Sequence, residues 1–173
     1  MGMLDRWFKG RTPRVGLPAY QAVIERARMP HWYLSGGVAD TIEGRFDMIA
    51  AVLAMVMLRL EQAGEGDAAV LTASLAECFV DDMDGQLRQI GVGDLMVGKH
   101  IGKMMAMLGG RLGAYRDALE QGTAAMDAAL IRNLYLGQAP DLEAVAHSRD
   151  SLIAFHTALR GLRVDQIRAG ELP

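Results

Sequence analysis

Residues 93–100 read GDLMVGKH, and the interpretation of this stretch decides which class of fold the chain adopts. The phosphate-binding loop has the pattern G-x-x-x-x-G-K-[ST], in which backbone amides and a lysine bind phosphates and a hydroxyl binds magnesium. Gly93, Gly98 and Lys99 fit this pattern, but His100 stands where the hydroxyl is required. A true phosphate-binding loop would also predict an α/β fold, because such a loop follows a buried strand.

The segment before this stretch has the spacing of a helix rather than that of a strand. Residues 68–90 place a large apolar side chain at every fourth position, which is typical of one helix face. These side chains are Leu71, Leu75, Phe79, Met83 and Leu87. We therefore interpret Gly91 and Gly93 as the end of one helix and Asp94 as the cap of the next. The stretch predicts a junction between two helices, and nucleotide binding is disfavoured.

The composition indicates one globular domain. The chain has 173 residues, of which 51% are hydrophobic and 23% are charged, so it can bury a substantial core. Its net charge of −3 argues against DNA, or any nucleic acid, as a partner of its whole surface. The single cysteine, Cys78, excludes an intrachain disulfide and is consistent with a reducing cytoplasm.

Residues 1–17 are predicted to be a loosely held arm that is rich in basic and aromatic side chains. The arm contains Trp7, Phe8, Lys9 and Arg11. This combination suits contact with a membrane surface, because aromatic rings lie at the headgroup boundary while cations face anionic lipids. The alternative is an arm that contacts nothing.

Residues 18–173 are predicted to form an all-α, single-domain bundle of about six helices. Capping residues, turn glycines and prolines set the boundaries. The predicted helices cover residues 19–29, 42–63, 68–90, 95–119, 123–137 and 140–169, with a turn-containing connection at 31–39. The longest apolar run, residues 48–58, is too short to cross a bilayer, so we expect it to be a buried helix.

One side of the helix predicted after Asp94 consists of small residues. They are Gly98, Gly102, Ala106, Gly109 and Gly113. Each interior glycine costs roughly 1 kcal/mol relative to alanine, so such a stripe calls for a reason. It predicts a close crossing with another helix of the same domain, which is the interpretation we favour, or a groove that accepts the helix of a partner.

The other sides of the same helix carry cations and apolar side chains. Lys99, Lys103 and Arg111 share a sector that we expect to be exposed. They form either a partner-facing surface or an ordinary solvated face paired with acids of the neighbouring helix. Met104 lies on the adjoining apolar face, and the twelve methionines of the chain suit a core or an adaptable binding surface.

Titratable side chains give no catalytic or metal-binding pattern. Glu77, Asp81 and Asp84 form an acidic stripe, which predicts a solvated face or a dock for a basic segment. The chain has no Glu-x-x-His sequence, which a dimetal carboxylate bundle requires. No nucleophile, base and orienting group can be matched to one another, so we expect no catalytic residue, metal or cofactor.

Two blocks of sequence resemble the ubiquinol–cytochrome c chaperone family. The first block contains Asp40-Thr41 and Gly44-Arg45-Phe46-Asp47. The second block contains Phe79, Asp82-Met83-Asp84, Leu87-Arg88, Gly91-Val92-Gly93-Asp94-Leu95, Val97-Gly98-Lys99, Lys103-Met104, Gly110-Arg111-Leu112 and Ala114-Tyr115. Their order and spacing extend over about residues 18–140 and are far more specific than any single motif.

The resemblance implies a non-enzymatic helper that binds newly made cytochrome b during assembly of the bc1 complex. It implies a bacterial branch that works at the cytoplasmic membrane face, whereas mitochondrial relatives act with a small partner protein near the ribosome. Lys99, Lys103, Arg111, Met104 and the glycines 98, 102 and 109 would then form the client-facing surface.

One departure from the family concerns haem. Relatives often carry a histidine in the helix after the Gly-Arg-Phe-Asp block, but residues 46–60 contain none. Direct haem contact through that position is therefore not implied. The alternative function is a helical carrier for an apolar ligand, such as quinone or haem, in a methionine-lined pocket.

Overall fold

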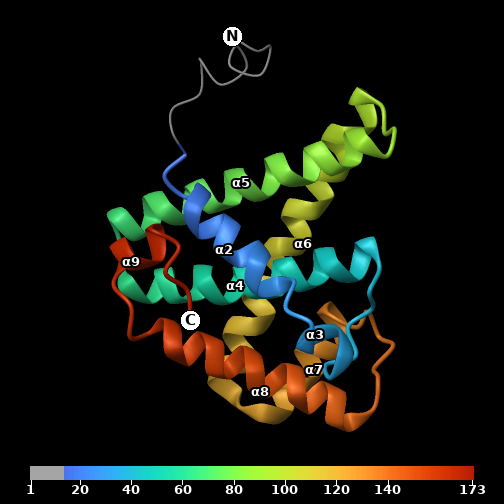
Figure 1. The fold of residues 1–173 in the computed structure, drawn as a ribbon, viewed down its shortest axis with the longest axis vertical. Coiled ribbons are helices and arrows are strands. Elements are labelled where there is room, and N and C mark those ends of the chain that lie inside the picture. The colour runs from blue at the N-terminus through green and yellow to red at the C-terminus, as the bar shows by residue number, and fades with distance from the viewer. Residues whose placement is uncertain (1–13) are drawn as a thin grey trace.

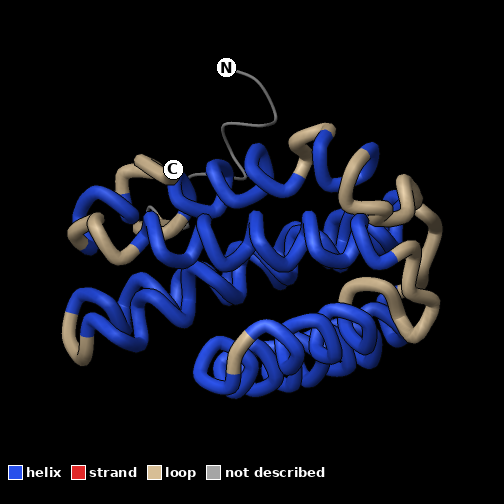
Figure 2. Tube along the Cα trace, turned by 90° about the horizontal axis from the view of Figure 1, so that it is seen from below, coloured by secondary structure: helices blue, strands red, loops and turns tan. Residues whose placement is uncertain are grey.

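The structure, a computed structural model, describes residues 14–173 apart from the side chains of Asp94, Leu95 and Val97. Its six longer helices are α2 (Leu17–Ala27), α4 (Ile42–Ala63), α5 (Asp67–Gln89), α6 (Asp94–Gln121), α7 (Thr123–Asn133) and α8 (Leu142–Leu159). Two short helices are α3 (His31–Leu34) and α9 (Val164–Arg168). Figure 2 shows helices and loops with no strand in this described part. The predicted all-α bundle is confirmed, and the six longer helices correspond to the six predicted ones.

The boundaries differ from the predicted ones at three places. The connection at 31–39 contains α3, which was not predicted. The last predicted helix is broken, because Arg163 is extended and α9 starts after it. Helix α7 ends at Asn133, before the predicted 137, since Leu136 and Gly137 adopt left-handed backbone angles with φ of 51° and 82°.

Helix α4 forms the centre of the molecule (Figure 1). Every residue from Asp47 to Leu58 is buried, which confirms that the apolar run is a core helix. Four helices pack against it, namely α2, α5, α6 and α8. A helix that is apolar on all sides requires such complete coverage.

The start of α4 is fixed by local contacts. The Thr41 hydroxyl accepts a hydrogen bond from the Gly44 amide at 3.0 Å and so caps the helix. A Cβ atom on Gly44 would overlap the Ala39 carbonyl, so this position requires glycine. Arg45 pairs with Asp40 at 2.7 Å in front of the helix. Together these contacts fix the position at which α4 begins.

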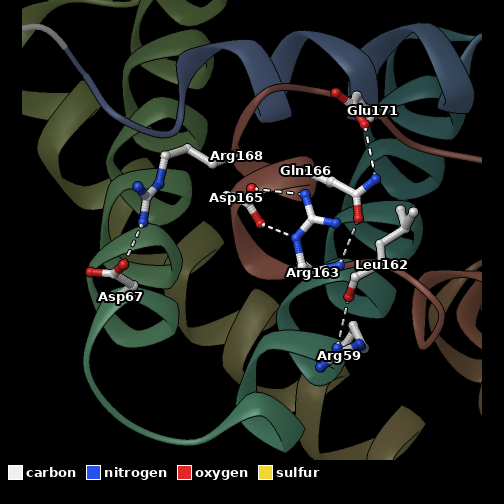
Figure 3. A network of polar contacts seen from close by, with 8 residues as sticks. All are labelled: Arg59, Asp67, Leu162, Arg163, Asp165, Gln166, Arg168 and Glu171. Atoms are coloured by element: carbon white, nitrogen blue, oxygen red, sulfur yellow. Dashed lines mark hydrogen bonds and ion pairs between the residues drawn. The ribbon is translucent and has the colours of Figure 1, made fainter.

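The C-terminal segment is fastened to α4 and α5 by polar contacts (Figure 3). Arg59 donates hydrogen bonds to the carbonyls of Leu159 at 3.1 Å and Leu162 at 2.9 Å, at the break between α8 and α9. Arg168 of α9 lies 3.4 Å from Asp67, the first residue of α5. The C-terminal segment therefore belongs to the same packed unit as the central helices.

The chain enters this unit across α5. The Gly16 amide donates to the Ser74 hydroxyl at 2.8 Å, and Arg14 forms an ion pair with Asp81. A basic residue of this same chain, Arg14, therefore pairs with Asp81 of the predicted acidic stripe. The predicted membrane-contact residues Trp7, Phe8, Lys9 and Arg11 lie outside the described residues.

Candidate functional site

An apolar groove with a volume of about 420 Å³ lies where α4 begins, α5 ends and α6 runs past both. We call it the α6 groove. Its apolar walls are formed by Phe46, Met83, Leu87, Met104 and Met107. Three further apolar lining residues, Ile42, Ile90 and Leu136, are more exposed than buried, at 65%, 64% and 58%. An apolar surface of this kind, left open to solvent, is typical of a binding site.

A few polar side chains also line the α6 groove. Glu43 lies on the α4 side, and His100 and Lys103 lie on the α6 side. Lys99 is exposed next to them but is not one of the lining residues. Neither Lys99 nor Lys103 has an ion-pair partner among the residues that the structure describes. Met104 and Lys103 are the two predicted partner-binding residues that the fold places in the groove.

A second hollow, with a volume of about 360 Å³, continues the groove between α6 and the end of α7. We call it the α7 hollow. It is lined by Met107, Gly110, Arg111, Ala114, Arg132, Asn133 and Leu136. Met107 and Leu136 line both hollows, so the two are adjacent. Leu136 has a φ of 51°, an unfavourable conformation for a non-glycine residue that is often found at functional sites.

Arg111 does not lie on the exposed sector that its spacing suggested. Its side chain is only 3% exposed and forms an ion pair with Asp47 of α4. Its guanidinium also lies 5.7 Å from the centre of the Phe46 ring. The expected exposure was wrong because a helical wheel shows the direction of a side chain but not a carboxylate on a neighbouring helix.

Burial and pairing act in opposite directions on the charge of Asp47. Burial raises the pKa of Asp47, while the nearby Arg111 guanidinium lowers it. Asp47 is part of the α4 wall of the groove, so its ion pair with Arg111 joins this wall to α6. Arg111 therefore supports the groove by holding its Asp47 wall against α6.

The glycine stripe of α6 does not contact another helix. A Cβ atom added at Gly98, Gly102, Gly109 or Gly113 would meet no atom within 4 Å. The close internal crossing that we favoured from the sequence is therefore wrong, because the stripe faces open space on the side of α6 away from its core contacts. None of these four glycines lines the α6 groove or the α7 hollow.

The residues of the family-like motifs form the wall of the groove and the turn that closes it. Gly44 and Arg45 fix the start of α4, whereas Phe46 lines the groove and stacks on Phe79 with ring centres 5.6 Å apart. At the other end, Gly91 has a φ of 85° and ends α5, and Gly93 is the N-cap of α6. Two more motif residues complete this set: Asp84 pairs with Arg88 at 3.0 Å, and the side chain of Asp94 lies outside the described residues.

The fold also brings together two histidines that lie far apart in the sequence. His31 Nδ1 lies 2.9 Å from His147 Nε2, and burial lowers the pKa of His31. Cys78 is buried, which raises the pKa of its thiol. No cluster of three or more His, Cys, Asp or Glu residues suited to a metal ion occurs within the described range. Among the same residues, no helix is both long and apolar enough to cross a membrane.

An all-α fold with an open groove lined by methionines is typical of proteins that bind apolar segments of other proteins. The family model for the ubiquinol-cytochrome C chaperone matches residues 35–172, and the chain belongs to this family. The structure is also similar to the crystal structure of the Cbp3 homolog from Brucella abortus. The TM-score is 0.79 and the identity is 28%, over 98% of this chain and 95% of the other. No curated protein matches the sequence.

Proposed function

We propose that this protein is an assembly chaperone that binds newly made cytochrome b in the α6 groove and assists biogenesis of the ubiquinol–cytochrome c reductase complex. Binding and release of the client require no catalytic residue, so we propose a non-enzymatic role. The observation that supports this proposal is the open apolar groove in a protein of the ubiquinol-cytochrome C chaperone family.

The side chains of the groove suit a client that is itself apolar. Met83, Met104 and Met107 are flexible and polarizable, so they can adapt to different apolar partners. Ile42, Ile90 and Leu136 leave apolar surface exposed around them, and a bound segment would remove this surface from water. A segment of cytochrome b awaiting membrane insertion or haem would present the matching surface.

The proposed client surface also includes charged and small residues on α6. Lys103 lines the groove and Lys99 lies beside it, so both would speed the association of a client with negative charge. Gly98, Gly102 and Gly109 leave the neighbouring face of α6 open, where a second partner such as a small protein or the ribosome could approach. Arg111 would act through its support of the groove wall.

We place this activity at the cytoplasmic face of the membrane in bacteria, where cytochrome b is inserted. The arm that precedes residue 14 has the composition of a surface anchor, with Trp7, Phe8, Lys9 and Arg11. A peripheral protein held there would meet its client as the client is made.

The experiment is a pull-down of cytochrome b from solubilised membranes with two matched leucine variants. Leu136→Glu places a charge in the groove, whereas Leu142→Glu places the same charge on a leucine that is 86% exposed and lies outside the groove. We expect Leu136→Glu to lose cytochrome b and Leu142→Glu to retain it. Equal recovery with both variants, or none with the unchanged protein, would contradict the proposal.

The volume of the groove supports one second candidate, a carrier for an apolar ligand. About 420 Å³ lies within the range of small-molecule sites, and His100 lines the groove. The absorption spectrum of the purified protein tests for haem, and solvent extraction followed by chromatography tests for quinone. A stoichiometric ligand that is lost in Met107→Glu would favour the carrier over the chaperone.

A further inference from the structure

The α7 hollow differs from the α6 groove in its charge. Its two charged lining residues are both arginines, Arg111 and Arg132, and no carboxylate lines it. The charge of Arg111 is balanced by Asp47. Arg132 is exposed, and within residues 14–173 it has no ion-pair partner. The hollow therefore has one positive charge that nothing in the described fold neutralises.

Arg111, which lines the hollow, also has a side-chain nitrogen without an acceptor. Arg111 uses Nη2 to bind Asp47, but its buried Nη1 makes no hydrogen bond to any described residue. Because Nη1 is buried, the guanidinium of the hollow that a ligand can reach is that of the exposed Arg132. An exposed arginine without an ion-pair partner is the chemistry that recognises a carboxylate.

The apolar groove leads directly to this charged hollow. The lining residues of α6 extend from His100 in the groove to Ala114 in the hollow, which is about 20 Å along a helix. That length matches about four turns of a second helix lying alongside. A segment seated on Met104 and Met107 would therefore bring one of its ends to Arg132.

We propose that the client segment bound here is an apolar helix with an acidic side chain at one end. Its apolar part would occupy the α6 groove, and its carboxylate would bind Arg132 in the α7 hollow. Lys103, on the α6 side of the groove, adds to the field that attracts the acidic end. This inference rests on the proposed function, since it takes the groove as the site of the client.

The test uses the full chain and two synthetic peptides labelled with fluorescein. Both peptides are Leu- and Ala-rich helices of about four turns. One carries Glu at each end, and the other is identical except for Gln at these positions. Anisotropy titrations should show the Glu peptide binding about tenfold more tightly, as expected for a charge-assisted pair.

Variants then assign the preference to Arg132. Arg132→Gln should abolish the preference and leave the affinity for the Gln peptide unchanged, and Arg132→Lys should retain part of the preference. Arg160→Gln is the matched control, because Arg160 is also exposed but lines neither the groove nor the hollow. This control should keep the full preference.

Three outcomes would overturn the inference. They are equal affinity of the unchanged protein for both peptides, an equal loss of both peptides in Arg132→Gln, and displacement of the Glu peptide by oleate at the same concentration. The last outcome would assign the hollow to a fatty-acid carboxylate. Failure of the inference leaves the proposed function standing if Leu136→Glu still loses cytochrome b. A peptide preference without any recovery of cytochrome b would reject the proposed client instead.

Discussion

Asp47 of α4, which lines the α6 groove, forms an ion pair with Arg111 of α6, which lines the α7 hollow, and their side chains are only 6% and 3% exposed. The two residues are 64 positions apart in the sequence. One belongs to the Gly-Arg-Phe-Asp block and the other to the later Gly-Arg-Leu block, so the pair gives a physical reason for both. It joins two of the three helices that line the groove, the third being α5.

Removal of one partner of this pair should destabilise the fold strongly. We expect Arg111→Ala to lower the free energy of unfolding by about 3–5 kcal/mol, because it leaves the Asp47 carboxylate buried without a partner. Urea denaturation measures this loss. The double variant Asp47→Leu with Arg111→Met should recover most of it, since apolar residues can replace a buried pair. A loss below about 1 kcal/mol in the single variant would show that Asp47 reaches water.

Substitution of the glycine stripe by alanine should stabilise the protein. Gly102→Ala and Gly109→Ala add a Cβ atom into open space, so each should gain up to about 1 kcal/mol from helix propensity. Gly44→Ala is the control, because its Cβ atom would overlap the Ala39 carbonyl and should destabilise α4. Thermal unfolding of the three variants measures both effects. A loss of stability in Gly109→Ala would instead support a close crossing of α6 with another helix, which the structure contradicts.

Leu136 should show a conflict between stability and binding. Its left-handed backbone suits glycine, so Leu136→Gly should leave stability unchanged or raise it by up to about 1 kcal/mol. The same change removes apolar surface from the groove and from the hollow, and cytochrome b recovery should fall. Leu142→Gly is the control, because it lies at the start of α8 with helical angles and should lose stability but keep the client. If Leu136→Gly is instead less stable than the unchanged protein, the contacts of the Leu136 side chain outweigh the strain of its left-handed backbone.

Acidification should destabilise the protein through His31, which is partly buried, and His156, which is buried. Burial lowers the pKa of His31 and of His156 below the ordinary value of 6.5. The unfolded chain therefore binds protons that the folded chain does not, and stability that is present above pH 6.5 is lost as the pH falls. The thermal midpoint should fall as the pH is lowered from 7.5 to 5.5. The fall should be smaller in the double variant that combines His31→Gln and His156→Gln. A parallel fall in that double variant would assign the effect to other groups.

The arm should contribute to membrane binding. Removal of residues 1–13 deletes the aromatic and basic side chains but keeps Arg14, which pairs with Asp81. We expect the shortened protein to lose flotation with anionic liposomes, while its thermal midpoint stays close to that of the full chain. Neutral liposomes provide the control for the charge. Flotation that is unchanged by the deletion would exclude the arm as an anchor.

The fold was predictable because helix patterns are local. Each of the two clearest patterns lies within a single helix. They are the apolar side chains at every fourth position from Leu71 to Leu87 and the apolar run at 48–58. The buried state of α4 follows from the same run, since no face of it is polar. The break after α8 was missed because the residues 160–163 carry no proline, and Gly161 alone is a weak stop signal.

The site was only partly predictable, since it is built from contacts between distant residues. Lys103 and Met104 were named from the sequence as partner-binding residues, and both line the groove. Nothing in the sequence showed that Arg111 meets Asp47. The approach of His31 to His147, 116 positions away, was equally hidden. Arg132 and Leu136 were missed as lining residues, although the helix end at Gly137 was predicted. The glycine stripe misled us because a rule from closely packed helix pairs was applied to a solvent-facing side.

The burial of α4 on every side has a consequence for folding. No fragment that lacks α2, α5, α6 or α8 can cover it, so each would expose a strongly apolar helix to water. We therefore expect the helices to assemble in one all-or-none transition, without a stable partly built form. Dissection of the protein into halves should give aggregates rather than working pieces.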